Sequence, residues 1–456
     1  SAPRIDGGGA CFHMAAGGAA GRAQGDQGFT AVGQGTAFCF AGRTAHLPPL
    51  SASMDDGPTL ETGRRCSTVR ERSRERDAPG TRASGPTCVG EVRHCWSVPC
   101  DGCVDGAPVV AVWSGEVARL VVASHAGVVR CLALTDGSEH WRRVLPDRVE
   151  ASVVACGSAW GPCGVVGAHN GALMLMSLTN GRACWRHSAE SSIRAAPLVS
   201  RRGRLWCGSH DQHMHVIDPL AGSDVLRIRC CGAIVATPCE ACDGSVIWGD
   251  LAGTLHCSAA EGPIRWRRHF SSPFFAGPTA PRVPLGDSRM LGVVAVTVRG
   301  EVHALGVANA AELWSHELQS AVFAAPVEAT GGVLVGCQNH RLQCLATADG
   351  ACLWALDLGA RIVATPCVFH RAGIEQVAAS SVSGRLVVAQ LPSGLHKSSS
   401  PRVLAEVVLG DESFASPVVC GKHLLCGARD DCLHCFELDC PLCPASEEAA
   451  GESSPS

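Results

Sequence analysis

A unit of roughly 40 to 51 residues recurs along most of this 456-residue chain, and the repeat limits the possible folds more than any other feature of the sequence. The unit is clearest from Ile193 to Gly222. It opens with the apolar run Ile193 to Val199, and two further runs begin at Leu205 and Met214. Each run is too short for a helix and lies between turn residues, which indicates a β-strand.

Eight copies of the opening run can be aligned, and seven of them end in proline. Their aligned last residues are Pro108, Val153, Pro197, Pro238, Pro278, Pro326, Pro366 and Pro417. This spacing is typical of the four-stranded blades of a β-propeller. The sequence therefore predicts an all-β fold, an eight-bladed β-propeller with a WD40-like architecture.

The fourth strand of a unit is marked by a tryptophan that follows a turn, and the third and seventh units lack it. The five complete examples are Gly137 to Trp141, Gly181 to Trp185, Gly262 to Trp266, Ala311 to Trp314 and Gly350 to Trp354. A sixth tryptophan, Trp96, has no opening run before it, whereas the eighth unit ends at about Leu438 after three strands. We expect the N-terminal strand around Trp96 to complete the last blade, because this closure removes an exposed sheet edge.

The propeller is predicted to span residues 91–439. Residues 1–90 are rich in Gly, Ala, Ser and Arg and show no strand or helix period, so we expect a disordered low-complexity segment. The run Arg64 to Asp77 could be a nucleic-acid arm, but Glu71 and Glu75 interrupt it and favour a solvated linker. Residues 440–456 are expected to form a disordered acidic tail.

Overall composition narrows the class of partner. A net charge of −4 and a pI near 6.5 provide no basic field for nucleic acid. No apolar run approaches the ~18 residues of a membrane span, and no signal sequence is visible. We therefore expect a cytoplasmic monomer that binds neither nucleic acid nor membrane. The 27 cysteines lie mostly within strand runs and are expected to be core residues rather than disulfides.

Three features together resemble the repeats of pyrroloquinoline-quinone (PQQ) propellers: the Ala-Ser/Thr-Pro opening, a Gly-Ser-His-Asp turn and the Gly-x-x-x-Trp ending. The resemblance covers Arg93 to Leu438. The order of units, with Gly208 to His213 in the third and Arg361 to Pro366 in the seventh, is similar to the C-terminal region of the beta-alanine-activating enzymes, or acyl-CoA synthetase family member 4.

That resemblance implies an ATP-dependent acid-adenylating domain and a phosphopantetheine carrier domain ahead of the propeller. The first 90 residues contain no phosphate-binding loop that ends in lysine. Leu285 to Ser288 has the Gly-x-Asp-Ser pattern of a carrier attachment site, but it lies between two strands rather than at the start of a helix, which favours a loop. We therefore expect a propeller without the catalytic parts.

The turn between the second and third strands of each unit supplies the candidate binding residues. Its aligned positions are His125, His169, His210, Leu251, Val298, Gln338, Val382 and Arg429. Such turns lie on the same face of a propeller as the connections between blades. We predict a solvated rim on this face that binds a protein partner or small ligand, carried by His125, His169, His210, Asp211, Arg148, Arg361 and Arg429. The three histidines could also sense pH or bind metal, but turns of adjacent blades are expected to lie too far apart for one ion.

Two cysteine groups are weaker candidates. The vicinal pair Cys230 and Cys231 has a counterpart in quinoprotein dehydrogenases, but the compact repeats leave no long loops for a calcium cage. The spacing of Cys432, Cys435, Cys440 and Cys443 resembles a zinc motif, although residues three apart on a strand face opposite sides. Cys100 and Cys103 are expected in a turn.

We therefore predict a non-catalytic binding or scaffold module with no cofactor and no metal. A PQQ-dependent dehydrogenase is the alternative.

Overall fold

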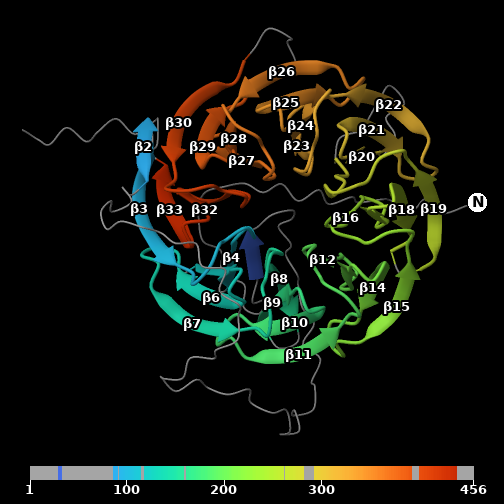
Figure 1. Cartoon of the computed structure of the whole chain (residues 1–456), viewed down its shortest axis with the longest axis horizontal. Helices are drawn as coiled ribbons and strands as arrows, with labels where there is room; N and C mark the ends of the chain where they lie inside the picture. The colour runs from blue at the N-terminus through green and yellow to red at the C-terminus, as the bar shows by residue number, and fades with distance from the viewer. Residues whose placement is uncertain are drawn as a thin grey trace, which may run out of the picture.

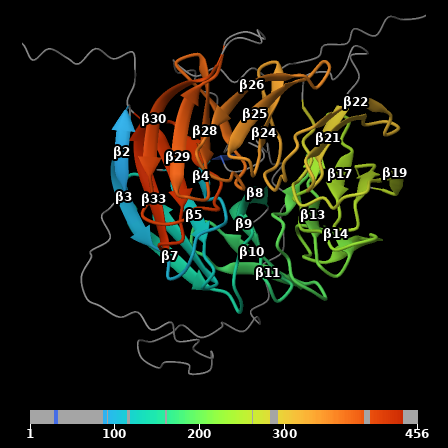
Figure 2. The ribbon, with the colours of Figure 1, turned by 45° about the horizontal axis from the view of Figure 1, so that its top comes forward.

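The structure, a computed structural model, describes residues 29–32, 86–90, 92–113, 118–158, 161–260, 262–281, 292–392 and 400–438. Every regular element among these residues is a strand, and no helix among them is long and apolar enough to span a membrane. The strands form eight blades arranged in a ring (Figures 1 and 2). The predicted eight-bladed all-β propeller is confirmed.

Each blade is an antiparallel sheet whose strands pair in chain order. The first comprises β4 (Val109–Trp113), β5 (Arg119–Ala123), β6 (Val128–Ala133) and β7 (Glu139–Val144), and the second β8 (Val154–Ser158), β9 (Gly161–Gly167), β10 (Ala172–Ser177) and β11 (Ala183–Ser188). The third comprises β12 (Leu198–Val199), β13 (Leu205–Gly208), β14 (His213–Ile217) and β15 (Asp224–Arg229), and the fourth β16 (Cys239–Glu240), β17 (Val246–Gly249), β18 (Thr254–Ser258) and β19 (Ile264–His269).

The second half of the ring repeats this pattern. The fifth blade comprises β20 (Gly292–Val296), β21 (Glu301–Gly306) and β22 (Glu312–Glu317), with a single bridge between Thr279 and Val294 at its inner side. The sixth comprises β23 (Val327–Ala329), β24 (Gly332–Gly336), β25 (Arg341–Ala346) and β26 (Cys352–Asp357), and the seventh β27 (Cys367–Arg371), β28 (Ile374–Ser380), β29 (Arg385–Gln390) and β30 (Arg402–Val408).

The eighth blade joins the two ends of the propeller. Its inner strands are β31 (Val418–Cys420), β32 (His423–Gly427) and β33 (Cys432–Leu438), and its outer strand is β3 (Val92–Pro99) from the other end of the chain. β3 runs antiparallel to β33, with Trp96 opposite Cys435. The predicted closure of the last blade by the strand around Trp96 is confirmed.

Two short strands lie within the segment expected to be disordered. β1 (Phe29–Val32) pairs with β4 near the centre of the ring, and β2 (Thr87–Gly90) pairs with β30 as a fifth strand of the seventh blade (Figure 1). The paired region therefore extends beyond the predicted boundary at residue 91. These segments carry no repeat pattern and their partners are distant in sequence, so no local signal marked them. The rest of residues 1–85, and residues 439–456, lie outside the described part.

The repeated tryptophans join neighbouring blades. Trp96 lies in the middle of β3, and its indole Nε1 donates a hydrogen bond to the Leu134 carbonyl of the next blade, 3.2 Å away. The same bond runs from Trp141, Trp185, Trp266 and Trp314 to the blades that follow them. The fourth strand continues for about three residues beyond the tryptophan, so the indole leaves the strand between its ends and reaches sideways into the next blade.

Glycine makes room for this contact. A Cβ atom added at Gly181 would lie 2.7 Å from the indole of Trp141, and Gly181 has a φ of +72°. Gly137 faces Trp96 in the same way. Gly262 is the equivalent glycine of the fourth blade, and the third blade before it has no tryptophan at the matching position. A Cβ atom added at Gly262 would meet no atom within 4 Å. The Gly-x-x-x-Trp pattern therefore has two parts. Its glycine makes room for the indole of the preceding blade, and its tryptophan packs against the following blade.

Candidate functional site

The eight aligned turn residues occupy equivalent places on one face of the ring. In each blade the backbone N–H of the turn residue donates to a carbonyl of the connection that leads into that blade, as from His169 to Arg148 at 3.0 Å. The other pairs are His125 with Cys103, His210 with Ser192, Leu251 with Ala233, Val298 with Pro273, Gln338 with Ala321, Val382 with Arg361 and Arg429 with Glu412. The face thus carries a ring of turns held by one repeated hydrogen bond.

A carboxylate at the second blade collects three positively charged or ionisable side chains. Glu150 Oε1 lies 2.9 Å from Arg148 Nη2 and 3.0 Å from His169 Nε2, and Glu150 Oε2 lies 2.8 Å from Arg194 Nη2. Burial raises the pKa of Glu150, but the hydrogen bonds and charges of Arg194 and His169 outweigh burial and lower it to about 2. Glu150 is therefore an anion that orients the surrounding donors.

A similar cluster joins the eighth blade to the first. Asp105 Oδ2 lies 2.9 Å from Arg429 Nη2 and 3.3 Å from His125 Nε2. Burial opposes ionisation of Asp105, yet the hydrogen bonds from His125 and Arg429 give it a lowered pKa. The Arg429 guanidinium also lies 3.8 Å from the centroid of the Phe414 ring, a cation–π contact. These contacts fix Arg429 between a carboxylate and an aromatic ring.

His210 completes the polar part of the ring at the third blade. Its Nε2 is buried and has no hydrogen-bond partner among the described residues. Burial, together with the charges of Arg194 and His169, lowers the pKa of His210, so its imidazole is neutral at pH 7. A neutral imidazole here can accept or donate one further hydrogen bond.

The structure separates Asp211 from the other predicted rim residues. Its side chain is only 3% exposed, and its Oδ2 accepts a hydrogen bond from His215 Nε2 at 2.9 Å within the third blade. Asp430 and His434 form the same pair in the eighth blade. The sequence interpretation was misleading at this position because a turn aspartate can face into the blade and support the third strand.

Arg361 lies on the rim but in different surroundings from Arg148. Both are exposed, and both belong to connections whose carbonyls accept the repeated turn hydrogen bond. The equivalent positions around Arg361 are Val363 and Val382, whereas those around Arg148 are Glu150 and His169. Arg361 therefore belongs to the apolar half of the face.

A second ring of equivalent residues, missed by the sequence analysis, lies beside the ring of turns. It is the second residue of each opening run: Asp105, Glu150, Arg194, Val235, Phe275, Phe323, Val363 and Phe414. The first three are charged and the last five are apolar. Phe275 is 42% exposed and its ring meets that of Phe323 edge-on, with centroids 5.2 Å apart. The change from charged to apolar residues along the chain at this fixed repeat position was the available signal.

The face is consequently divided into two arcs. The polar arc covers the eighth and first three blades: Asp105, His125, Arg148, Glu150, His169, Arg194, His210 and Arg429. The apolar arc covers the fourth to seventh blades: Val235, Leu251, Phe275, Val298, Phe323, Val363 and Val382. Gln338 and Arg361 are polar members of this half, and Phe414 is an apolar member of the other half. The polar arc carries three arginines against two carboxylates, so it retains positive charge when its histidines are neutral.

The cysteine candidates form no comparable site within the described residues. Cys230 is buried and Cys231 is exposed, and both thiols are free. Cys432 and Cys435 lie on one continuous strand, β33. Residues three apart on a strand point to opposite faces, so these two thiols do not face one ion. Cys440 and Cys443 lie outside the described residues. Cys100 is buried and Cys103 half-buried at the connection into the first blade.

Comparison with protein families gives a match over most of the ring. Residues 100–438 match the family model described as "Beta-alanine-activating enzyme, beta-propeller". The chain belongs to this propeller family. Two curated relatives carry the name beta-alanine-activating enzyme: one from Danio rerio is 33% identical over 110 residues, and one from Drosophila melanogaster is 24% identical over 364 residues.

These matches cover 23% and 75% of this chain, but only 9% and 34% of the respective relatives. The chain thus spans about a third or less of their length, and its family membership concerns the propeller. The resemblance to beta-alanine-activating enzymes stated from the repeat motifs is confirmed for this region.

Solved structures show the same fold at low identity. BamB from Moraxella catarrhalis aligns with a TM-score of 0.58 at 15% identity, covering 76% of this chain and 97% of that protein. The C-terminal WD40 domain of Sif2 aligns with a TM-score of 0.61 at 11% identity, covering 77% and 99%. These likenesses concern the fold alone.

Proposed function

We propose that this propeller is a non-catalytic binding module of the beta-alanine-activating enzyme family, and that its binding surface is the face formed by the polar and apolar arcs. The division of two repeat-equivalent rings into these arcs carries the proposal. In a fold built from eight similar units, equivalent positions have similar backbone surroundings, so a change of chemistry halfway round the ring reflects a two-part ligand rather than the demands of the fold.

The arcs indicate the chemistry of that ligand. Arg148 and Arg194 are partly exposed and can donate to a carboxylate or phosphate, while Phe275 and Phe323 form an aromatic pair in which Phe275 is exposed and Phe323 half-buried. An extended peptide with acidic residues at one end and large apolar residues at the other satisfies both. Function depends on the residues of a site rather than on the fold that carries them, so these side chains, and not the propeller fold, indicate the ligand.

The relatives are named for the activation of beta-alanine, and we propose that this region contributes binding rather than chemistry to such a protein. A cytoplasmic setting fits the free thiols, since cytosolic cysteines stay reduced. We propose a monomer that binds neither PQQ nor nucleic acid.

Fluorescence anisotropy with labelled peptides tests the proposal. The probe is a peptide with three glutamates followed by three residues chosen from Phe and Leu, and the reference peptide has lysine in place of each glutamate. Binding of the acidic peptide alone is expected. Arg148→Ala should weaken it by about 10-fold or more, the usual loss for a charge-assisted hydrogen bond, and Phe275→Ala should weaken it as well.

The matched control is Arg142→Ala, which removes an exposed arginine from the outer strand β7 on another side of the molecule. It should bind the acidic peptide like the parent protein. Equal affinity for both peptides, no binding of either, or equal losses in all three variants would overturn the proposed surface.

A further inference from the structure

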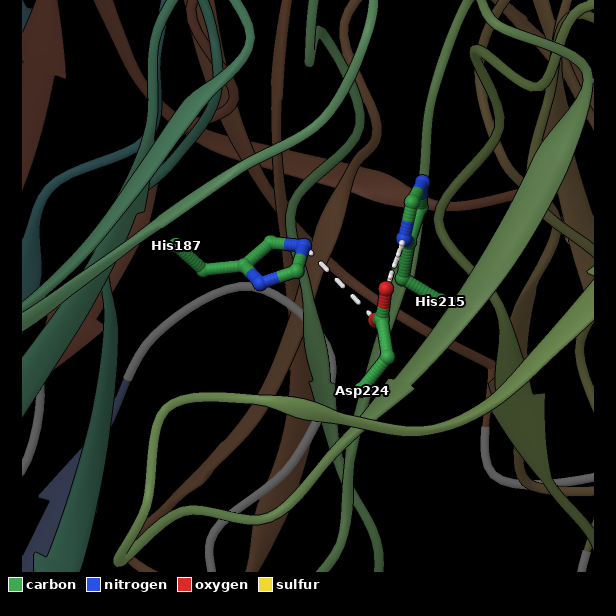
Figure 3. A group of neighbouring side chains, drawn as sticks. All are labelled: His187, His215 and Asp224. Atoms are coloured by element: carbon green, nitrogen blue, oxygen red, sulfur yellow. Dashed lines mark hydrogen bonds and ion pairs between the residues drawn. The ribbon is translucent and has the colours of Figure 1, made fainter.

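Three metal-binding side chains meet where the outer strand of the second blade lies beside the third blade (Figure 3). His187 is on β11, His215 on β14 and Asp224 on β15. One ligand atom from each lies within 4.8 Å of the other two. We propose that His187 Nε2, His215 Nδ1 and the Asp224 carboxylate bind one Zn²⁺ ion that links the two blades.

The distances between the ligand atoms fit one small cation. Zinc binds imidazole nitrogen at about 2.0–2.1 Å and carboxylate oxygen at about 2.0–2.2 Å, so neighbouring ligands of a tetrahedral ion lie about 3.3 Å apart. His215 Nδ1 is 3.1 Å from Asp224 Oδ1, and His187 Nε2 is 3.6 Å from the same oxygen. The three residues already approach a zinc-binding arrangement, and small side-chain rotations would close the third distance.

The hydrogen bond to Asp211 determines which nitrogen of His215 faces the site. His215 Nε2 donates to Asp211 Oδ2 at 2.9 Å, and Asp211 is itself held by the backbone N–H groups of His213 and Glu190. With Nε2 bound to the Asp211 carboxylate, Nδ1 is the ring nitrogen of His215 that faces Asp224, where its lone pair would bind a metal ion. A carboxylate that supports a histidine in this way is the usual outer contact of a zinc ligand.

The hydrogen bonds of His187 give it the same orientation towards the site. The backbone of Gly222 accepts a hydrogen bond from the His187 ring. His187 Nε2 is buried, has no hydrogen-bond partner among the described residues and lies 3.6 Å from Asp224 Oδ1. This nitrogen therefore also faces the Asp224 carboxylate.

Two imidazole nitrogens and a carboxylate therefore converge on one place, where a cation would interact with all three. A single proton can satisfy only one nitrogen–oxygen pair, whereas a divalent metal ion satisfies all three ligands. Two imidazoles and one carboxylate suit zinc and leave a fourth coordination position. Asp224 is 23% exposed, so water can reach that position.

The other charged groups at the site nearly cancel. Arg227 Nε lies 3.8 Å from Asp224 Oδ2 and competes with a cation, but Arg227 also pairs with Glu190 at 3.0 Å. With Asp224 and Asp211 as anions, one divalent ion brings the cluster close to neutrality. The site lies between β11 of the second blade and strands β14 and β15 of the third; none of its three ligands belongs to the two arcs, and it does not depend on the proposed binding face.

The test uses the whole chain, stripped with EDTA, with its exposed thiols blocked by N-ethylmaleimide because cysteines also bind zinc. Zinc retained after gel filtration is measured by mass spectrometry, and Co²⁺ is used as a spectroscopic probe. One equivalent of zinc is expected, together with a rise in Tm and a cobalt spectrum without thiolate charge-transfer bands. His187→Gln and Asp224→Asn should lose this equivalent, and Asp211→Asn should weaken zinc binding by about 10–100-fold.

His213→Gln is the matched control, because His213 lies on the same strand but is not one of the three ligands; its Nδ1 lies 2.9 Å from the Asp211 carbonyl oxygen and 3.5 Å from Asp211 Oδ1. It should bind zinc like the parent protein. Metal-free melting curves show whether each variant is folded. If His187→Gln is not folded, the near-isosteric Asp224→Asn still provides the test. Retention of zinc by both ligand variants, thiolate bands in the cobalt spectrum, or no bound zinc would overturn the site.

Discussion

Removal of the closing strand should destabilise the propeller strongly. A chain that begins at Cys103 lacks β2 and β3, so β33 is left with an unpaired edge. It also lacks Trp96, which is 9% exposed and packs in one cluster with Leu132 and Leu134 of the first blade and with Leu433 and Cys435 of the eighth. The loss therefore affects both the sheet and the contact between the ends of the ring.

The magnitude can be estimated from Trp96 alone. Removing a buried tryptophan side chain costs about 3–5 kcal/mol, including the cavity that remains. The hydrogen bond from Trp96 Nε1 to the Leu134 carbonyl falls within that cost, and the lost strand pairing adds to it. A typical domain unfolds with a free energy of about 5–15 kcal/mol. A chain beginning at Cys103 should therefore melt far below the parent protein or aggregate through its open edge.

Circular dichroism melting and light scattering measure this effect. The matched control begins at Thr87; it lacks β1, as does the chain that begins at Cys103, but keeps both β2 and β3, and it should melt far above that chain. A chain beginning at Glu91, the predicted start of the propeller, also loses β2, whose half-buried Cys88 packs against the core of the last two blades. We expect a small loss there. Equal melting temperatures for chains beginning at Thr87 and Cys103 would refute the closure argument.

Three further predictions concern single positions and the alternative cofactor. Gly181→Ala should lower the free energy of unfolding by more than Gly203→Ala, because both glycines have positive φ but only Gly181 faces an indole, that of Trp141. Urea unfolding of the two variants therefore compares a steric clash plus backbone strain with backbone strain alone. Equal losses of stability would contradict the role of Gly181 in receiving the indole. Glu150, with its pKa lowered from 4.5 to about 2, contributes stability above about pH 4.5 that is lost as pH falls towards 2. Glu150→Gln should therefore cost up to about 3 kcal/mol near pH 7 and almost nothing near pH 2, and a cost independent of pH in urea titrations would show that its charge is unimportant. Added PQQ with Ca²⁺ should leave the melting temperature unchanged and support no dye reduction, whereas a clear shift with dye reduction would favour the dehydrogenase alternative.

The blade number and the closure could be predicted from the sequence because both depend on local, repeated signals. A strand opening, a tight turn and a tryptophan recur at nearly constant spacing, and each blade must bury its faces against neighbours of the same kind. The displaced strand at Trp96 could be recognised because the eighth unit has only three strands and the strand at Trp96 has no opening run before it. By contrast, β2 pairs with β30 more than 300 residues away, and no repeat pattern marks it.

The candidate rim was predictable only in part. Alignment of the turns identified His125, His169 and Arg429 because equivalent positions in a repeat lie on one face. It could not show that Asp211 faces into its blade, nor that Glu150 and Asp105 are the carboxylates around which the rim is arranged.

The sequence by itself determined the repeat, the number of blades and the positions that share a face, because these follow from local strand and turn chemistry. Only the tertiary structure decided which side chains meet across blades. His187 and Asp224 are 37 residues apart in sequence and belong to different blades, and their side chains converge because the outer strand of one sheet packs beside the next. Sequence spacing carries no information about such contacts, since the angle and distance between neighbouring sheets are set by the packing of the whole ring.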